Sequence, residues 1–437
     1  MARRKREPET GQIRSVTHDG RGIVTGDGKK VFVAGALAGE TVRYLRRKSR
    51  RNFDEAELLE VVEPAVGRVE PRCAVYGRCG GCSLQHMSVE AQREIKLQTL
   101  RDNLTRIGSV EPKRWLKPLV GEPWNYRRRA RLAVKDVAGK GRVLVGFRER
   151  HAPYITDMRR CEVLAGPLDA LIEPLSELIG GLSIRARLPQ IEVAVADNAT
   201  ALVFRVLDPP SEADRTALVT FAKQQGLTVY LQPGGLDSVA ALYPADARLS
   251  YALPAFDVEL DFGPLDFIQI NADVNRRMVE RAVSELAPEA CDRVLDLYCG
   301  IGNFSLPLAR HAAEVLGIEG ERSLVARAAA NAARNGITNV RFECADLSAI
   351  DGREAWCKTG WDLVLLDPAR SGAAEPVARM AALSPRRIVY VSCHPGTLAR
   401  DAGALVHTQS FRLDAAGIID MFPHTAHVES IAVFSRI

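Results

Sequence analysis

Apolar and polar residues alternate along the N-terminal part of the chain. Between residues 10 and 64 this alternation runs through five short segments that are separated by glycine-containing turns. The segments cover residues 11–16, 22–24, 30–33, 40–44 and 57–62. A period of two residues is typical of strands with one buried face, and several short strands joined by turns favour a small barrel. We therefore predict a five-stranded β-barrel of the OB type over residues 10–64.

The central part of the chain mixes several patterns. Residues 65–92 show no regular period and are expected to form a loop, whereas apolar residues recur at helical spacing over residues 88–107. Residues 124–262 combine short helical stretches with strand-like runs at residues 131–134, 142–147 and 191–195. This mixture predicts a central α+β domain over residues 65–262.

The rhythm changes near residue 263 to an alternation of helices and apolar runs of strand length. The runs cover residues 294–297, 315–318, 340–342, 363–366 and 388–391, and helical stretches such as residues 321–335 separate them. Helices that alternate with buried strands are typical of a doubly wound α/β domain with a parallel sheet. We predict a Rossmann-like domain over residues 263–437, and a basic tail at residues 1–9 ahead of the barrel.

The composition is that of an ordinary globular protein, with 437 residues of which 46% are hydrophobic and 26% are charged. No apolar run reaches the roughly 18 residues that a membrane helix needs. No apolar segment follows the first basic residues, as it would in a secretory signal. We expect a cytoplasmic protein of about three domains, in which the nine cysteines are reduced.

Positive charge is concentrated near the N-terminus. Residues 1–52 contain 14 lysines and arginines against five acidic residues, which gives a net charge of +9, whereas the whole chain carries +5. A basic arm on a nearly neutral body is typical of a nucleic-acid-binding protein. A solubilising tail has the same composition, and the charge alone does not separate the two interpretations.

A glycine-rich turn follows the first apolar run of the α/β domain. Gly300 and Gly302 precede a helical stretch, and glycine allows the backbone to approach a ligand closely. The position of a third glycine in dinucleotide-binding turns is taken by Leu306 or its neighbours, which favours a smaller nucleoside ligand. Glu319 ends the next apolar run, where its carboxylate can accept hydrogen bonds from two ribose hydroxyls. An incidental acid in a generic nucleotide fold is the alternative.

Four cysteines form a second candidate site. Cys73, Cys79 and Cys82 are separated by five and two residues, and Cys161 is distant in the sequence. Thiolates at such spacing hold zinc or a [4Fe–4S] cluster, and the spacing alone does not choose between them. Four other cysteines lack ligand spacing and are expected to pack in the interior: Cys291, Cys299, Cys344 and Cys357.

Motifs in the C-terminal part of the chain carry a resemblance to a known family. They are Asp367-Pro368-Ala369-Arg370, Ser392-Cys393-His394-Pro395, residues 267–271 and residues 422–430. Together with the glycine-rich turn, these motifs resemble the S-adenosylmethionine-dependent RNA (uracil-C5)-methyltransferases. The resemblance spans about residues 263–430, and it implies an enzyme that forms 5-methyluridine in RNA.

The resemblance also implies roles for individual residues. Uracil C5 is a poor nucleophile until a thiolate adds at C6, and a base then removes the C5 proton after methyl transfer. By resemblance, Cys393 is the nucleophile and Glu429 is the proton acceptor; a packing cysteine and a solvated carboxylate are the alternatives. Contacts to the cofactor are implied for Gln269, Tyr298, Asn303, Glu319, Asp346 and Asp367.

RNA contacts are expected at three places. Residues 10–64 resemble a TRAM domain, an OB-like RNA-binding barrel, and a basic run lies on or beside it: Arg46, Arg47, Lys48, Arg50 and Arg51. Residues 124–131 interleave aromatic residues with arginines, namely Arg127, Arg128, Arg129 and Arg131. Such groups bind phosphates and stack on unpaired bases, and a solvated basic face is the alternative. Phe267 is expected to lie near the extruded base or to pack in the core.

The combination of barrel and cysteine motif resembles one branch of the family. In the rRNA branch the same cysteine pattern holds a [4Fe–4S] cluster, whereas the tRNA branch typically lacks both features and a shorter rRNA branch lacks the barrel. The resemblance therefore favours a structural or RNA-positioning [4Fe–4S] cluster and a monomeric enzyme that methylates 23S rRNA, or its precursor, at the uracil-1939 type of site. It also implies that residues 93–123 pack on the catalytic domain.

Three alternatives remain at this point. They are a uracil-C5 methyltransferase for tRNA or another rRNA site, a cytosine-C5 RNA methyltransferase, and a non-catalytic RNA-binding factor for ribosome assembly.

Overall fold

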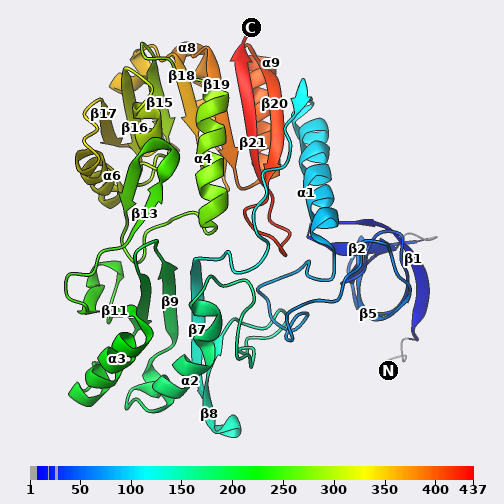
Figure 1. Cartoon of the computed structure of the whole chain (residues 1–437). Coiled ribbons are helices and arrows are strands. Elements are labelled where there is room, and N and C mark those ends of the chain that lie inside the picture. Colours follow the sequence, from blue (N-terminus) through cyan, green and yellow to red (C-terminus); the bar gives the residue numbers. More distant parts are fainter. Residues whose placement is uncertain (1–6, 18, 25–27) are drawn as a thin grey trace. The chain divides into compact units, whose positions relative to one another are not determined.

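The computed structural model describes residues 7–17, 19–24 and 28–437 (Figure 1). The chain divides into two compact units. Unit 1 contains Met1–Thr99, as far as described, together with Arg148–Tyr154 and Phe422–His427. Unit 2 contains Leu100–Phe147, Ile155–Met421 and Val428–Ile437. No helix among the described residues is both long and apolar enough to cross a membrane.

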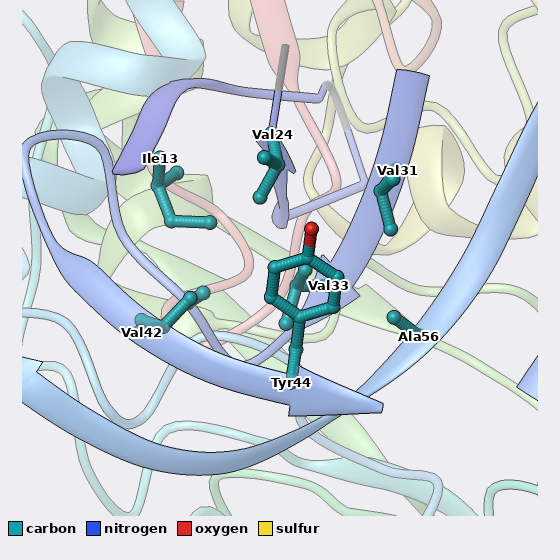
Figure 2. Packing of buried hydrophobic residues seen from close by; sticks show 8 residues of the cluster. Ile13, Val24, Val31, Val33, Val42, Tyr44 and Ala56 are labelled. Carbon is teal, nitrogen blue, oxygen red and sulfur yellow. The ribbon is translucent and has the colours of Figure 1, made fainter. Parts of the chain in front are cut away.

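The N-terminal part of unit 1 is a closed five-stranded barrel, which confirms the prediction for this region. Its strands are β1 (Glu9–Val16), β2 (Arg21–Val24), β3 (Lys30–Ala34), β4 (Thr41–Ser49) and β5 (Phe53–Glu63). They follow the order β1-β2-β3-β5-β4, and β4 pairs with β1 to close the barrel. Alternate residues point inward and form its core, as Figure 2 shows for Ile13, Val24, Val31, Val33, Val42, Tyr44 and Ala56.

The rest of unit 1 is mostly irregular. A loop over residues 64–88 carries three of the four cysteines of the second candidate site and leads into α1 (Val89–Asn103). The Gln92 side chain holds the C-terminal segment Phe422–His427, since its Oε1 accepts the His424 N–H at 2.7 Å. The predicted helix over residues 88–107 is therefore present, although a short π-helical turn, η1 (Leu104–Gly108), replaces its last turn.

Unit 2 contains a six-stranded sheet in the order β12-β11-β10-β9-β7-β8. Its strands are β7 (Arg129–Val137), β8 (Arg142–Gly146), β9 (Gln190–Val195), β10 (Thr200–Arg205), β11 (Leu227–Gln232) and β12 (Ala240–Tyr243). Helix α2 (Ile172–Gly180) contacts β8, and α3 (Glu212–Gln225) contacts β11. The mixture of strands and short helices predicted for this region is present.

The second sheet of unit 2 has eight strands in the order β17-β16-β15-β18-β19-β21-β20-β6. Five of them are parallel neighbours and coincide with the five predicted apolar runs: β15 (Arg293–Leu297), β16 (Glu314–Glu319), β17 (Val340–Cys344), β18 (Leu363–Leu366) and β19 (Arg387–Ser392). The remaining three are β20 (Phe411–Ile419), the antiparallel β21 (Glu429–Arg436) and the short β6 (Arg114–Trp115). Most residues of the central strands β15, β16, β18 and β19 are buried, which explains why these runs are mostly apolar.

Helices and a short hairpin complete this part of unit 2. The helices are α4 (Ala272–Leu286), α5 (Ser305–Ala309), α6 (Arg322–Arg334), α7 (Ala374–Val377), α8 (Met380–Leu383) and α9 (Pro395–Thr408). The hairpin pairs β13 (Ser250–Leu253) with β14 (Val258–Asp261). Because β6 pairs with β20, part of the segment over residues 93–123 belongs to the same sheet as the predicted catalytic strands. The predicted domain boundaries themselves remain predictions.

Candidate active site

The glycine-rich turn connects β15 to α5 at the carboxyl edge of the eight-stranded sheet. Tyr298, Gly300 and Gly302 all have positive φ angles, of 67°, 55° and 94°. A Cβ atom added at Gly300 would meet no atom within 4 Å, so the space beside this backbone is open. Ligands of open α/β sheets bind at the carboxyl ends of the strands, and this turn offers room for one.

Glu319 lies beside the turn at the end of β16. Its carboxylate accepts the Gly300 N–H at 3.1 Å and the Gly320 N–H at 2.8 Å. The side chain is thereby held against the turn and remains only half-buried. Such a fixed carboxylate can accept hydrogen bonds from two neighbouring hydroxyl groups, as the sequence predicted for a ribose.

Asp296 is a buried carboxyl group beneath the turn that the sequence did not single out. Ser305 Oγ donates to its Oδ2 at 2.5 Å, and its Oδ1 has no hydrogen-bond partner among the described residues. Burial raises the pKa of Asp296 to about 7; the Ser305 hydrogen bond opposes this shift, and the charges of Asp367 and Glu319 add to it. In the sequence, the indication of this buried carboxyl group was a single acidic residue within an otherwise apolar run.

The amide of Asn303 is fixed by two residues from outside the turn. Its Oδ1 accepts from Tyr251 Oη at 2.9 Å and from Asn275 Nδ2 at 3.1 Å, and its Nδ2 donates to Asn275 Oδ1 at 3.1 Å. Tyr251 and Asn275 were not among the predicted site residues, because their spacing along the chain carries no motif. They fix the orientation of a side chain that belongs to the predicted cofactor turn.

Two further predicted cofactor residues differ in exposure. Gln269 is 8% exposed, and its backbone oxygen accepts Arg128 Nε at 2.7 Å. Asp346 lies on the surface after β17, where its Oδ1 accepts from the backbone N–H and the hydroxyl of Ser348. The sequence could not reveal this difference, because both residues lie outside the apolar runs.

The register of β19 and β21 brings Cys393 and Glu429 to the same place. Ser392, the last residue of β19, pairs with Ser430 of β21. Cys393 follows Ser392 and Glu429 precedes Ser430, so the two predicted catalytic residues extend from neighbouring strands. Asp367 follows β18, the neighbour of β19 on its other side. Cys393 is half-buried and Glu429 is 4% exposed.

The three groups perturb one another electrostatically. Burial, with the Glu429 and Asp367 charges, raises the pKa of Cys393 to about 11. Burial and Asp367 raise the pKa of Glu429 to about 8, while burial alone raises that of Asp367 to about 7. Arg370 opposes the shifts of both Cys393 and Glu429. The site therefore pairs a protonated thiol with carboxyl groups that titrate near neutrality, a pattern typical of acid–base sites.

Helix α9 holds the loop that carries Arg370. Thr397 Oγ1 donates to the Arg370 carbonyl at 3.2 Å, and Arg400 Nη2 donates to the Ser371 carbonyl at 3.0 Å. The buried Asp401 accepts the Ala373 N–H and the Tyr390 hydroxyl, both at 2.8 Å. Since α9 begins directly after Cys393, one helix fixes both the cysteine end of β19 and the loop after β18.

The four cysteines of the second candidate site lie in different units. Cys73, Cys79 and Cys82 lie in the irregular loop of unit 1, where the Gly81 N–H points to Cys79 Sγ at 3.4 Å, and Cys161 lies in unit 2. Among the described residues, no group of three or more histidine, cysteine or acidic side chains is arranged to hold a metal ion. The chemistry of the donor set, four soft thiolates, fits an iron–sulfur cluster or zinc.

The other cysteines correct one expectation. Cys299 is buried, as predicted, and Cys357 is half-buried, but Cys291 and Cys344 are exposed. Cys291 precedes β15 and Cys344 ends the edge strand β17, so neither position lies in the interior. An acidic residue beside each of them, Asp292 and Glu343, was the indication of this in the sequence.

The predicted RNA-contacting arginines have unequal access to solvent. Arg128 is only 3% exposed and stacks over the Tyr251 ring at 4.6 Å, so its position lends no support to a contact with RNA. Arg129 is half-buried and donates to the Pro264 carbonyl, and Arg127 donates to the Arg129 carbonyl. Two predicted residues are exposed, namely Arg131, which is paired with Glu192, and Phe267, which is 70% exposed.

The basic run of the barrel is largely paired with acids of the neighbouring strand. Arg46 binds Glu9 and Asp54, while Arg47 binds Glu57 and Arg50 lies 3.5 Å from Glu55. Strand β5 is rich in carboxylates, and it pairs with β4 along its whole length. The sequence showed the charges but not this register, which offsets much of the positive charge of the run.

Comparisons with known proteins identify relatives over the whole chain. The model of the tRNA (Uracil-5-)-methyltransferase family matches residues 261–437. A protein of Alkalilimnicola ehrlichii named 23S rRNA (uracil(1939)-C(5))-methyltransferase RlmD is 53% identical over 441 residues, which cover 100% of this chain and 99% of the relative. A protein of the same name from Methylococcus capsulatus is 52% identical over 98% of this chain and 97% of its own length.

A solved structure shares the fold. The Pyrococcus abyssi tRNA (uracil-54, C5)-methyltransferase, in complex with S-adenosyl-L-homocysteine, superposes with a TM-score of 0.75 at 24% identity. The match covers 98% of this chain and 100% of that chain. A protein named for a tRNA substrate therefore has this fold from end to end, so the presence of a barrel does not by itself select an rRNA substrate.

Proposed function

Since this chain belongs to the family of S-adenosylmethionine-dependent RNA (uracil-C5)-methyltransferases, we propose that it methylates C5 of uracil-1939 in 23S rRNA. The observation that carries the choice of substrate is the identity of 53% over the full length of a relative with that activity in its name. The juxtaposition of Cys393 and Glu429 at the ends of paired strands supports a catalytic protein over a non-catalytic binding factor.

The cofactor site proposed here lies at the carboxyl edge of the Rossmann-like sheet. S-adenosylmethionine, when bound, supplies a methyl group activated by a sulfonium charge. Glu319 holds the ribose hydroxyls, and the fixed amide of Asn303 binds the methionine part together with Tyr298 and Gln269. Asp346 lies near the adenine, and Asp367 lies near the sulfonium and the target base. The open space beside Gly300 supports this arrangement.

Cys393 acts as the nucleophile in this proposal. Its thiol gives up its proton to solvent, and the thiolate sulfur forms a bond to C6 of the uracil as the π bond between C5 and C6 breaks, which places negative charge on O4 and C5. Because burial, together with the charges of Glu429 and Asp367, raises the pKa of this thiol, the thiolate is disfavoured in the free enzyme. Arg370 opposes this shift, and the loop that carries it is hydrogen-bonded to α9 through Thr397.

Glu429 removes the proton from C5 after methyl transfer. The C5–H bond breaks, its electron pair expels the Cys393 sulfur from C6, and 5-methyluridine is released. A base with a pKa of about 8 has enough proton affinity to accept this proton near neutral pH. An uncharged glutamine at this position would leave the protein attached to the RNA.

We further propose that Cys73, Cys79, Cys82 and Cys161 hold a [4Fe–4S] cluster, with no step in methyl transfer. The support is the chemistry of four thiolates and the N–H of Gly81 directed at Cys79 Sγ, which is typical of a sulfur that carries negative charge. Iron, sulfide and zinc analysis of anaerobically purified protein tests this. A brown protein with about four irons per chain supports the cluster, and a colourless protein with stoichiometric zinc refutes it.

Methyl transfer with labelled S-adenosylmethionine tests the main proposal. The substrates are 23S rRNA from cells that lack this methylation and, for comparison, a tRNA T-arm. We expect labelled 5-methyluridine at one site of the 23S rRNA, no label in tRNA, and loss of both label and covalent adduct in Cys393→Ala. Labelled tRNA without labelled rRNA would refute the choice of substrate, and labelled 5-methylcytidine would refute the reaction.

A cytoplasmic location and a monomeric state fit an enzyme that acts on rRNA, and both remain part of the proposal. Light scattering of the purified protein with and without RNA tests the monomer. TRAM-like RNA binding by the barrel belongs to the same proposal, supported by its closed five-stranded topology.

A further inference from the structure

Two half-buried phenylalanines lie outside the core of the barrel. Val31 and Val33 of β3 point into the interior (Figure 2), so Phe32 between them lies on the opposite face of the strand. Phe53 begins the neighbouring strand β5 and is likewise absent from the core. The two ring centroids are 4.9 Å apart with an interplanar angle of 33°. Core packing does not account for an aromatic pair on this face.

A guanidinium group extends the aromatic pair. Arg21 of β2 places its Cζ 4.8 Å from the centroid of the Phe32 ring, and its Nε pairs with Asp19 at 2.8 Å. Strands β2, β3 and β5 are consecutive in the barrel, so Arg21, Phe32 and Phe53 form one continuous patch. We call these three residues the stacking platform. Unpaired bases stack on aromatic rings and on guanidinium planes of this kind.

Positive charge surrounds the platform. Lys30 is exposed and pairs in register with Phe53, and Arg50 and Arg51 lie in the loop that leads into β5. Arg50 lies 3.5 Å from Glu55, and Arg46 and Arg47 on β4 are likewise bound to acids of the barrel. Cations beside an aromatic surface complement the phosphates on either side of a stacked base.

We propose that the stacking platform binds one or two unpaired bases of the RNA substrate. OB barrels commonly bind oligonucleotides on the face of their second and third strands and on the loops that flank it. The platform occupies that face, with Arg21 on β2 and Phe32 on β3. The identity of the RNA rests on the proposed function, whereas the platform itself rests on the geometry of the barrel.

Binding of a fluorescein-labelled 23S rRNA fragment that contains uracil-1939 tests the platform. In the full-length protein, Phe32→Ala is expected to raise the Kd about 5- to 150-fold, because loss of one stacked base removes about 1–3 kcal/mol. Phe32→Trp is expected to bind within about threefold of wild type, with tryptophan emission that the RNA quenches. The slope of log Kd against log salt is expected to stay unchanged, since no phosphate contact is lost.

Leu59→Ala is the matched control, because Leu59 lies on β5 and is 42% exposed outside the platform. Binding of Phe32→Ala within twofold of wild type, with an unchanged melting temperature, would overturn the proposal. Full binding by Phe32→Leu would also overturn it, because apolar area rather than a ring would then suffice. If RNA binding depends on the Phe32 ring but the wild-type protein methylates no RNA, the proposed function is refuted and the proposed stacking platform is still supported.

Discussion

Replacement of Glu429 by glutamine is expected to abolish turnover and yet stabilise the protein at high pH. In the folded protein the pKa of Glu429 is raised to about 8 by burial and by Asp367, from an ordinary value of 4.5. Below pH 4.5 the side chain is protonated in both the folded and the unfolded chain, so its burial carries no charge penalty. Above pH 4.5 the unfolded chain ionises first, and stability falls until the folded group ionises near pH 8.

The magnitude follows from the width of this window. One pKa unit corresponds to about 1.4 kcal/mol, so an upward shift from 4.5 to about 8 costs at most about 5 kcal/mol of unfolding free energy. Because Asp367 titrates in the same range and is coupled to Glu429, the protons of the pair are shared. We therefore expect Glu429→Gln to gain about 2–5 kcal/mol over wild type at pH 9, and close to nothing at pH 4.5.

Thermal melting of wild type and Glu429→Gln across this pH range measures the effect. A gain of that size corresponds to a rise of about 4–10 °C in the melting temperature of unit 2 at pH 9. Glu280→Gln is the control, since Glu280 is exposed on α4 of the same unit. A difference between Glu429→Gln and wild type that does not change with pH would refute the reasoning, as would a loss of stability at pH 9.

Three further predictions concern the same edge of the sheet. Glu319→Gln is expected to weaken S-adenosylmethionine binding about tenfold or more, through loss of charge-assisted hydrogen bonds, whereas the control Glu321→Gln should leave binding unchanged. Calorimetry measures the affinity of both variants, and an equal loss of affinity in the two would contradict the ribose-binding role of Glu319. Gly372→Ala is expected to lower the free energy of unfolding by about 1–3 kcal/mol, because φ is +80° and an added Cβ would approach α9 side chains to 2.6 Å. Gly360→Ala is the control, since a Cβ there would meet nothing within 4 Å. Urea unfolding measures the stability of both variants, and equal stability would contradict the close packing at Gly372. Binding of S-adenosylmethionine at pH 7.5 is expected to release more protons than binding of S-adenosylhomocysteine, since only S-adenosylmethionine carries a sulfonium charge. Titration calorimetry in two buffers of different ionisation enthalpy measures the number of protons released, and equal release by the two ligands would contradict the coupling between the sulfonium charge and the carboxyl groups.

The sequence predicted what depends on local periodicity and missed what depends on register. The runs that became β15, β16, β18 and β19 are mostly apolar because these strands are buried on both faces, whereas the edge strand β17 is largely exposed. The pairing of β4 with β5, which sets Arg46 against Asp54, is not encoded in the spacing of either strand. Arg128 likewise looked like part of a basic surface, but the chain folds it over Tyr251. Composition gives a residue's chemistry, and only the fold gives its neighbours.

The resemblance to the family supplied the proposed catalytic pair, and the structure adds the electrostatic setting of these two residues. Motifs placed Cys393 and Glu429 near one another; they did not reveal that Asp296 lies buried under the glycine turn with an unsatisfied oxygen. Nor did they separate the surface position of Asp346 from the interior position of Gln269. These differences decide which of the predicted contacts carry large energies, because buried charges interact more strongly than exposed ones.

The carboxyl groups at the edge of the sheet form one electrostatic system. Asp367 raises the pKa of both Asp296 and Glu429, and Glu319 adds to the shift of Asp296. A ligand with a positive charge favours the ionised form of such groups, and a neutral ligand does not. In the proposed reaction the methyl group leaves the sulfonium and bonds to the enolate carbon, so a positive and a negative charge disappear together and their effects on Glu429 oppose each other. The raised pKa of Glu429 is the stability cost of a buried carboxyl group, and the proton affinity that it reflects is what the proposed removal of the C5 proton uses; replacing this carboxyl group should therefore stabilise the fold at high pH while the covalent adduct persists.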